Sequence, residues 1–174
     1  MVGYLLDTQV ITYWFDGTSG QFPNVQAAAE ARERDAPLYV SAVSFGEISL
    51  GHAINPAGAG PRRDEFLTFL RDRLPTILEI SRHTAEPYGS IRAALANQFP
   101  PPGGWNKTRR AEQMYDPIAG RELGIQENDL WIVAQAVERN LVLVSSDKMK
   151  RIRDAVAAVV PGFVVENWAH ATTP

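Results

Sequence analysis

Cysteine is absent from this 174-residue chain, which excludes disulfides, thiolate zinc sites and cysteine nucleophiles. Histidine is scarce, and His52, His83 and His170 follow no metal-binding spacing, so we interpret them as structural or exposed residues. The chain also lacks a G-x-S-x-G or phosphate-loop sequence. These absences argue against ordinary serine hydrolases and nucleoside-triphosphate enzymes.

Long apolar runs and an excess of positive charge are missing as well. No apolar stretch approaches the ~20 residues needed to cross a bilayer, and no basic segment followed by an apolar run marks a signal peptide. We therefore expect no membrane segment, and the lack of cysteine fits a reducing cytoplasm. The net charge of −3 leaves nucleic-acid binding open, because phosphate contacts depend on local clusters of lysine and arginine.

The residues that are present indicate one α/β domain over 1–174. Hydrophobic residues make up 45% and charged residues 21% of the chain, which is a globular composition. Short β-rich apolar runs alternate with segments of helical periodicity, and this predicts a mostly parallel sheet covered on both faces by helices. We expect strands over 2–7, 37–44, 76–81, 141–147 and 162–168, and helices over 8–17, 22–35 (with Asn24 as cap), 45–54, 62–75, 83–99, 128–140 and 148–159.

Residues 99–126 interrupt this alternation. Three prolines and two glycines follow Phe99, and no clear periodicity appears before the next helix. We interpret the segment as a long loop with one short helix around Arg109 to Tyr115, and long loops in compact domains tend to be functional or disordered. A shorter loop is expected over 55–61.

Four acidic residues fall where functional groups of an α/β sheet collect, beyond the carboxyl ends of the strands. Asp7 and Asp147 end two predicted strands, Glu47 lies near the start of the helix after a third strand, and Asp129 begins the apolar helix 128–140. Two carboxylates about 4 Å apart repel by roughly 4 kcal/mol at an effective dielectric constant of ~20, so such a cluster requires protonation or a cation. Oxygen ligands without histidine or cysteine select Mg²⁺ or Mn²⁺.

Each acid also has a local explanation. Asp129 or Asn128 is explained, taken alone, by capping of its helix. Asp147 is equally well explained as a cap for the next helix, and Asp7 as a turn residue. Glu47 is the hardest to explain locally, because glutamate among apolar neighbours is seldom buried without a partner.

The segments "YLLDTQV", "SFGEISLG", "ENDLWIVAQAVERNLVLVSSD" and "VENW" together resemble the PIN-domain ribonucleases, and in particular the VapC toxins of toxin–antitoxin pairs. The resemblance spans nearly the whole chain except residues 98–120, which look like an insertion. It implies a three-layer α/β/α domain and a cytoplasmic, Mg²⁺- or Mn²⁺-dependent endoribonuclease that cleaves structured or single-stranded RNA. It also implies an antitoxin partner, and we expect a homodimer.

Residue by residue, Asp7, Glu47, Asp129 and Asp147 fall on the acidic quartet of that family. Thr8 and Ser145 fall on its hydroxyl positions, whereas Gln9 stands where asparagine or serine is more usual. The resemblance implies that Mg²⁺ or Mn²⁺, held chiefly by Asp7 and Asp129, activates a water that attacks a phosphodiester. Glu47 and Asp147 would orient the water or a second ion.

Two basic clusters could contact the RNA backbone. One is Lys107, Arg109 and Arg110, near Trp105 as a stacking residue. The other is Lys148, Lys150, Arg151 and Arg153, for which an ordinary solvated helix face is an equal explanation. Tyr13, Trp14 and Phe15 cannot all face one core at helical spacing, so we expect at least one of them at an interface.

Two further functions remain open at the level of sequence. One is a catalytically weak partner that acts mainly in an antitoxin and DNA-binding regulatory complex. The other is a metal-dependent DNA nuclease or phosphatase that uses the same acids. A phosphatase with an aspartyl nucleophile would carry a second acid two residues after Asp7, where Gln9 stands.

Overall fold

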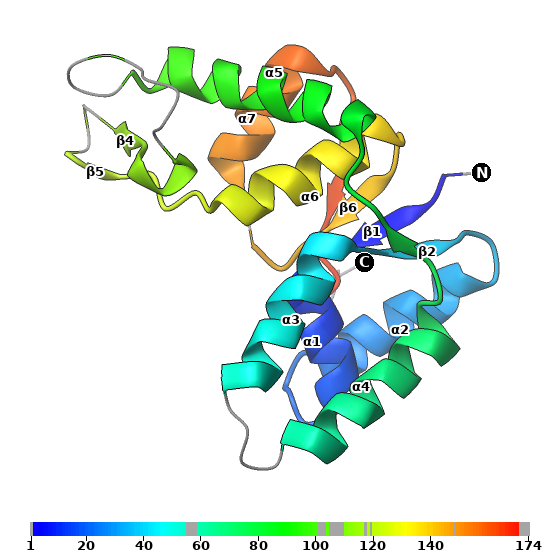
Figure 1. Cartoon of the computed structure of the whole chain (residues 1–174). Coiled ribbons are helices and arrows are strands. Elements are labelled where there is room, and N and C mark those ends of the chain that lie inside the picture. Colours follow the sequence, from blue (N-terminus) through cyan, green and yellow to red (C-terminus); the bar gives the residue numbers. More distant parts are fainter. Residues whose placement is uncertain are drawn as a thin grey trace. The chain divides into compact units, whose positions relative to one another are not determined.

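The computed structural model describes residues 2–54, 59–100, 104, 110–116, 118, 120–147 and 149–170, with the backbone alone for 59–61, 150 and 151. The chain divides into two compact units (Figure 1). We call residues 1–79, 140–147 and 164–174 the sheet unit, and residues 80–139 and 148–163 the helical unit. The single domain predicted for 1–174 stays a prediction.

The sheet unit contains a five-stranded sheet in the order β3-β2-β1-β6-β7, and all of its strand pairs are parallel. Its strands are β1 (Tyr4–Leu6), β2 (Leu38–Ser41), β3 (Ile77–Leu78), β6 (Val142–Val144) and β7 (Val165–Glu166). Leu6 pairs with Val144, which in turn pairs with Glu166. Three neighbouring strands therefore end level with one another, at the edge where the sequence predicts the acids.

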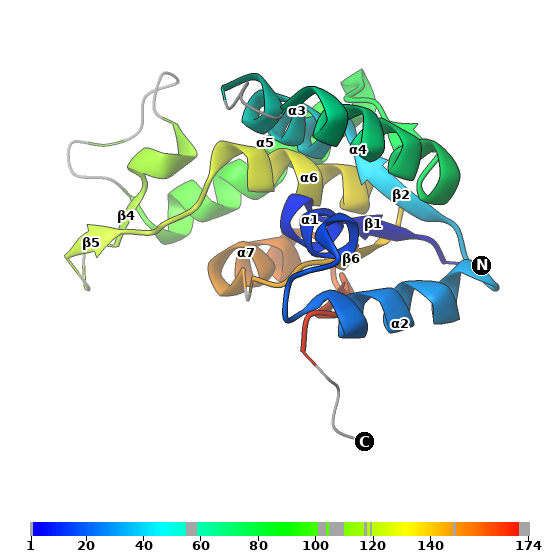
Figure 2. The ribbon, with the colours of Figure 1, turned by 90° about the horizontal axis from the view of Figure 1, so that it is seen from below.

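Four helices belong to the same unit: α1 (Thr8–Asp16), α2 (Phe22–Glu33), α3 (Ala42–Ile54) and α4 (Ala59–Arg73). Helix α1 lies between α2 and the α3–α4 pair (Figure 2). It ends at Gly17, whose φ of 60° a glycine adopts without strain. Helix α1 therefore begins directly after Asp7 and is packed on two sides.

The aromatic cluster of α1 is packed more completely than its sequence spacing predicts. Trp14 is buried and meets Phe69 edge-on, with ring centroids 5.3 Å apart. Phe15 is half-buried and meets Phe66 at 5.2 Å, and Tyr13 also packs against this core. The premise that the three cannot all face one core is wrong, because α4 supplies a second apolar surface to α1. Tyr13 and Phe15 are only partly buried, so a role at an interface stays a prediction.

The helical unit contains α5 (Arg82–Gln98), the 3₁₀ helix η1 (Ala111–Gln113), the hairpin strands β4 (Tyr115–Asp116) and β5 (Arg121–Glu122), α6 (Glu127–Glu138) and α7 (Lys150–Val159). Helix α5 packs against both α6 and α7. Helix α6, apolar in sequence, is buried on all its sides, and residues such as Leu130, Ile132 and Val133 are fully buried. No helix in the described part of the chain is long and apolar enough to cross a membrane.

Several expected boundaries are wrong. Helix α4 begins at Ala59, inside the loop expected over 55–61, whose first four residues lie outside the described ones. The short helix expected around Arg109 to Tyr115 is present as the 3₁₀ helix η1, and the antiparallel hairpin β4–β5 that follows it was not expected. Helix α2 begins after Gln21, and Asn24 instead donates to the carbonyl of Ala169 at 3.2 Å.

Candidate functional site

The side chain of Asp7 is fixed at the carboxyl end of β1, where it caps α1. Its Oδ1 accepts a hydrogen bond from the backbone N–H of Thr8 at 2.7 Å, and its Oδ2 accepts one from the hydroxyl of Ser145 at 2.8 Å. Ser145 follows β6, the strand paired with β1, so the parallel register brings the two residues together. Asp7 is only 6% exposed, which makes it an acid held in place with little solvent. The local role of Asp7 is thus that of a helix cap and not of a turn residue, and it leaves the carboxylate at the predicted edge.

Glu47 and Asp147 act on Asp7 electrostatically. Burial is the largest cause of the raised pKa of Asp7, hydrogen bonds from Ser145 and Thr8 lower it, and the charges of Glu47 and Asp147 raise it further. The hydroxyl of Thr8 also donates to Glu47 Oε2. Three of the four predicted acids thus lie together in the sheet unit.

Hydroxyl and amide side chains organise the loop after β6. The backbone N–H of Asp147 donates to Ser145 Oγ at 3.1 Å, so one serine contacts two acidic positions. Asp147 does not cap α7, which begins only after Met149. Ser146 Oγ donates to Gln9 Oε1 at 2.6 Å and joins α1 to the same loop. Sequence reasoning gave Gln9 no role, although a polar residue in the first turn after Asp7 was the available signal.

The fourth acid, Asp129, belongs to the helical unit. It lies in the first turn of α6, where its Oδ2 accepts from the backbone N–H of Gln126 at 3.4 Å. Gln126 is the N-cap, and Asp129 is the N3 residue of its capping box. Asp129 therefore caps the helix as its local explanation expects, although neither it nor Asn128 holds the N-cap position itself. Its convergence with Asp7, Glu47 and Asp147 stays a prediction.

The three acids of the sheet unit fit a hard divalent cation in charge and ligand type. Carboxylate and hydroxyl oxygens are the ligands that Mg²⁺ and Mn²⁺ prefer, and a cation would relieve the repulsion that raises the pKa of Asp7. Among the described residues, no group of three or more His, Asp or Glu side chains is arranged as a metal site. Two of the carboxylates are hydrogen-bonded by Thr8 and Ser145, and each keeps further lone pairs with which it could bind an ion.

The predicted RNA contacts fall mostly outside the described residues. Lys107, Arg109, Trp105 and Lys148 lie there entirely, as do the side chains of Lys150 and Arg151. Arg110 and Arg153 are exposed. The backbone N–H of Arg110 donates to Gln113 Oε1 at 3.0 Å, which fixes the start of η1.

The histidine interpretation is confirmed. His83 and His170 are exposed. His52 packs in the sheet unit with its ring centroid 5.9 Å from that of Phe66.

The PIN domain family model matches residues 4–155, so the chain belongs to the PIN-domain family. This confirms the α/β fold class and the family resemblance. PIN domains are typically nucleases and generally use divalent metal ions. No curated protein sequence matches the chain.

Three solved structures show what the fold is similar to. A chain of VapBC2 from Rickettsia felis, solved with a DNA fragment from its promoter, is 22% identical with a TM-score of 0.69, covering 97% of this chain and 99% of that one. A chain of FitAcB from Neisseria gonorrhoeae is 20% identical with a TM-score of 0.64, over 97% and 99%. A chain of VapBC-1 from nontypeable Haemophilus influenzae is 19% identical with a TM-score of 0.64, over 98% and 100%.

Proposed function

We propose that this protein is a metal-dependent endoribonuclease toxin held inactive by an antitoxin. The observation that carries the proposal is the environment of Asp7. It is a buried carboxylate, and the charges that act on it, those of Glu47 and Asp147, are also carboxylates. Such an arrangement is unfavourable without a cation and suits a site that binds one. Family membership supports nuclease chemistry, since PIN domains are typically nucleases.

Each residue has a proposed role in cleavage. Asp7, Glu47, Asp147 and Asp129 would hold Mg²⁺ or Mn²⁺, which when bound supplies a water of lowered pKa and stabilises charge on the phosphoryl oxygens. Ser145 and Thr8 hold the carboxylates of Asp7 and Glu47 in fixed positions. Lys107, Arg109 and Arg110 would bind RNA phosphates through their positive charge.

Cleavage assays with three substrates test the proposal. Purified protein is incubated with RNA, DNA or a generic phosphomonoester, in Mg²⁺, Mn²⁺ or EDTA. We expect cleavage of RNA alone, lost in EDTA and lost in Asp7→Asn. Asp35→Asn, which changes an exposed acid of the same unit, is the matched control and should cleave normally. Retained cleavage in Asp7→Asn would remove the central residue of the proposal.

The proposed partners follow from the proposed activity. The structural neighbours are VapBC and FitAB complexes, which favours an antitoxin as the inhibitor of this chain. A homodimer and a cytoplasmic location, where RNA is available, complete the proposal. Co-expression with the product of a neighbouring small open reading frame should yield a stable complex that no longer cleaves RNA.

A second candidate function is a binding role in a DNA-bound regulatory complex with little catalysis. The observation in its favour is that the VapBC2 neighbour was solved on promoter DNA. Under this alternative the purified chain cleaves none of the three substrates, whereas its complex with antitoxin binds promoter DNA. RNA cleavage by the purified chain therefore distinguishes the two functions.

A further inference from the structure

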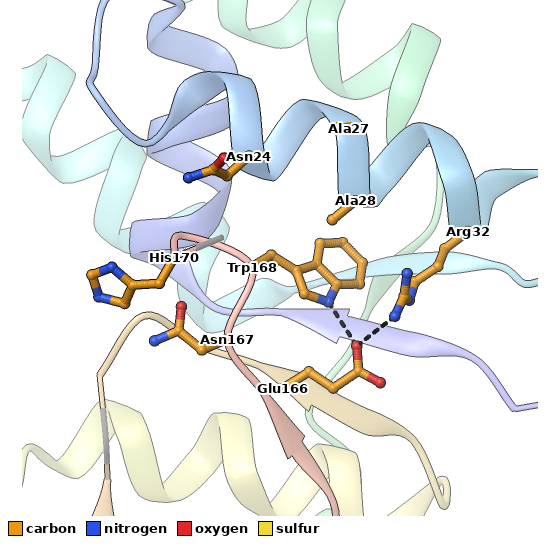
Figure 3. A pocket seen from close by; sticks show the side chains of 8 residues that line it. All are labelled: Asn24, Ala27, Ala28, Arg32, Glu166, Asn167, Trp168 and His170. Atoms are coloured by element: carbon orange, nitrogen blue, oxygen red, sulfur yellow. Dashed lines mark hydrogen bonds and ion pairs between the residues drawn. The ribbon is translucent and has the colours of Figure 1, made fainter. Parts of the chain in front are cut away.

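The sheet unit contains a pocket between α2 and the segment that follows β7 (Figure 3). We call it the α2–β7 pocket. It encloses about 570 Å³, within the range of roughly 300–1,000 Å³ that is usual for small-molecule sites. Ala27 and Ala28 present only methyl groups from α2, and Trp168 lines the pocket from the opposite segment. The ring of Trp168 is only 4% exposed, so the apolar wall of this slot is formed chiefly by the alanine methyl groups, and polar and charged side chains line the rest.

A charged pair is held rigidly at one end of this slot. Glu166 Oε2 accepts hydrogen bonds from the Trp168 indole N–H at 2.8 Å and from the Arg32 guanidinium at 3.1 Å (Figure 3). The guanidinium also lies 5.4 Å from the centre of the Trp168 ring and 5.5 Å from that of Tyr4. Glu166 Oε1 has no hydrogen-bond partner within the described residues, so it can accept from an N–H group of a ligand.

The pocket is joined to the acidic edge of the sheet. Asn167 donates through Nδ2 to the carbonyl of Ser146 at 3.2 Å, and its Oδ1 accepts from the N–H of Ala169 at 2.9 Å. Ser146 lies between Ser145, which contacts Asp7, and Asp147. Neighbouring strands are ~4.8 Å apart, so the register that pairs β1, β6 and β7 places the residue after Glu166 roughly 10 Å from Asp7. A strand of nucleic acid with a phosphate at Asp7 would reach the pocket with an adjoining nucleotide.

We propose that the α2–β7 pocket binds a nucleotide of the RNA strand next to the phosphodiester that is cleaved. This inference rests on the proposed function. The alanine methyl groups of α2 give a base an apolar contact, and Glu166 Oε1 accepts from its N–H groups. Arg32 and the exposed His170 face the sugar–phosphate. A peptide segment of a protein partner is less well matched, because the apolar part of the lining is small and the remainder is polar or charged.

Binding of mononucleotides tests the pocket directly. The probes are AMP, GMP, CMP and UMP, titrated without metal, and the readout is the NMR resonance of the Trp168 indole N–H. We expect at least one nucleotide to shift this resonance in a saturable way. Ala27→Leu, which places an isobutyl group in the slot, should weaken this binding about tenfold, as expected for loss of a base contact. Ala31→Leu, one turn further along α2 and outside the pocket, is the matched control and should bind normally.

Two results would overturn the inference. One is a Trp168 resonance that none of the four nucleotides shifts, including the case in which only the cognate antitoxin shifts it. The other is equal nucleotide affinity in Ala27→Leu and Ala31→Leu.

Kinetics separate this inference from the proposed function. We expect Ala27→Leu to raise KM for RNA about tenfold with a smaller effect on kcat, because a contact to a remote nucleotide contributes to binding before and during the reaction. Metal-dependent RNA cleavage with an unchanged KM in Ala27→Leu overturns the pocket alone. Cleavage retained by Asp7→Asn overturns the proposed function, whatever the pocket binds.

Discussion

At the scale of the residue, Asp7 is a buried carboxylate with negative neighbours. Its effect on the free energy of unfolding therefore depends on pH. Its pKa is raised in the folded protein, so the folded state favours the protonated form. The stability that Asp7 contributes is therefore fully present below the unfolded-state pKa, 3.8, and is lost as pH rises through the raised folded-state pKa. Above the raised folded-state pKa and without metal, the ionised carboxylate destabilises the fold.

We therefore expect Asp7→Asn to be more stable than the wild type at pH 7 in EDTA. The substitution removes the cost of ionising a buried carboxylate beside two others, and the gain is offset in part by weaker bonds to Ser145 and Thr8. Urea unfolding at pH 7 and below pH 4 measures it, and the gain should vanish at the lower pH. An unchanged difference at both pH values would show that titration of Asp7 has no part in it.

Tyr88 in the helical unit gives a second pH prediction. Burial first, and then its hydrogen bond to Glu127, raise the pKa of Tyr88 to about 12 from its ordinary value of 10.0, while Arg92 lowers it. Between these two pH values the folded protein keeps a proton that the unfolded chain releases, so stability falls as pH rises through this range. Urea unfolding of wild type and Tyr88→Phe from pH 9 to 12 should show a steeper loss in the wild type. Parallel profiles would contradict this assignment.

At the scale of the element, Glu127 joins the 99–126 segment to α6. Its carboxylate accepts from the Tyr88 hydroxyl, from Arg92 at 3.0 Å and from the backbone N–H of Ala111 at 2.9 Å. Its own N–H donates to Glu112 Oε1 at 2.9 Å. One residue thus ties α5 and η1 to the first turn of the helix that carries Asp129.

Removal of this carboxylate should loosen that junction. Glu127→Ala leaves a guanidinium and an N–H without their acceptor, at a cost of about 1–3 kcal/mol. Hydrogen exchange should accelerate in η1, β4 and β5, whereas Glu122→Ala, at an exposed acid of β5, should leave it unchanged. Equal exchange in the two variants would show that the segment is held by other contacts.

The types and order of the strands and helices were predictable, but their ends often were not. The apolar runs around Leu6, Val40 and Val144 predict buried parallel strands because such strands are covered on both faces. Caps depend on which side chain reaches an N–H in three dimensions, and Asn24 is instead used in a contact to the remote Ala169. The two-residue strands β4 and β5 are too short to show a periodicity of two.

At the scale of the whole molecule, a metal that binds only the folded state should stabilise it. At a metal concentration of 100 times Kd the gain is about 2.7 kcal/mol, and it raises Tm. We expect Mn²⁺ to raise Tm of the wild type and to have a much smaller effect on Asp7→Asn. Thermal unfolding followed by circular dichroism measures both, with Asp35→Asn as control. An equal rise in all three proteins would indicate binding elsewhere.

The acids of the candidate site were predictable because strand ends of a parallel sheet share one edge, and three of the four lie there. The α2–β7 pocket was not predictable. Its lining combines two alanines of α2 with the segment from Glu166 to His170, which follows more than a hundred residues later in the chain. The pairing of β6 with β7 places that segment in the sheet. No motif in either segment marks such a pocket, whereas the charge of an acid after a strand is visible in the sequence itself.

The ring of Trp131 stacks on that of Tyr88 with centroids 3.8 Å apart and planes inclined by 6°. Light absorbed by the phenol is therefore passed to the indole, and the emission of Trp131 becomes an optical gauge of α5–α6 packing two residues from Asp129. Trp14 and Trp168 lie in the other unit. Single-tryptophan variants would let a spectroscopist watch each half of the protein in turn during unfolding or inhibition.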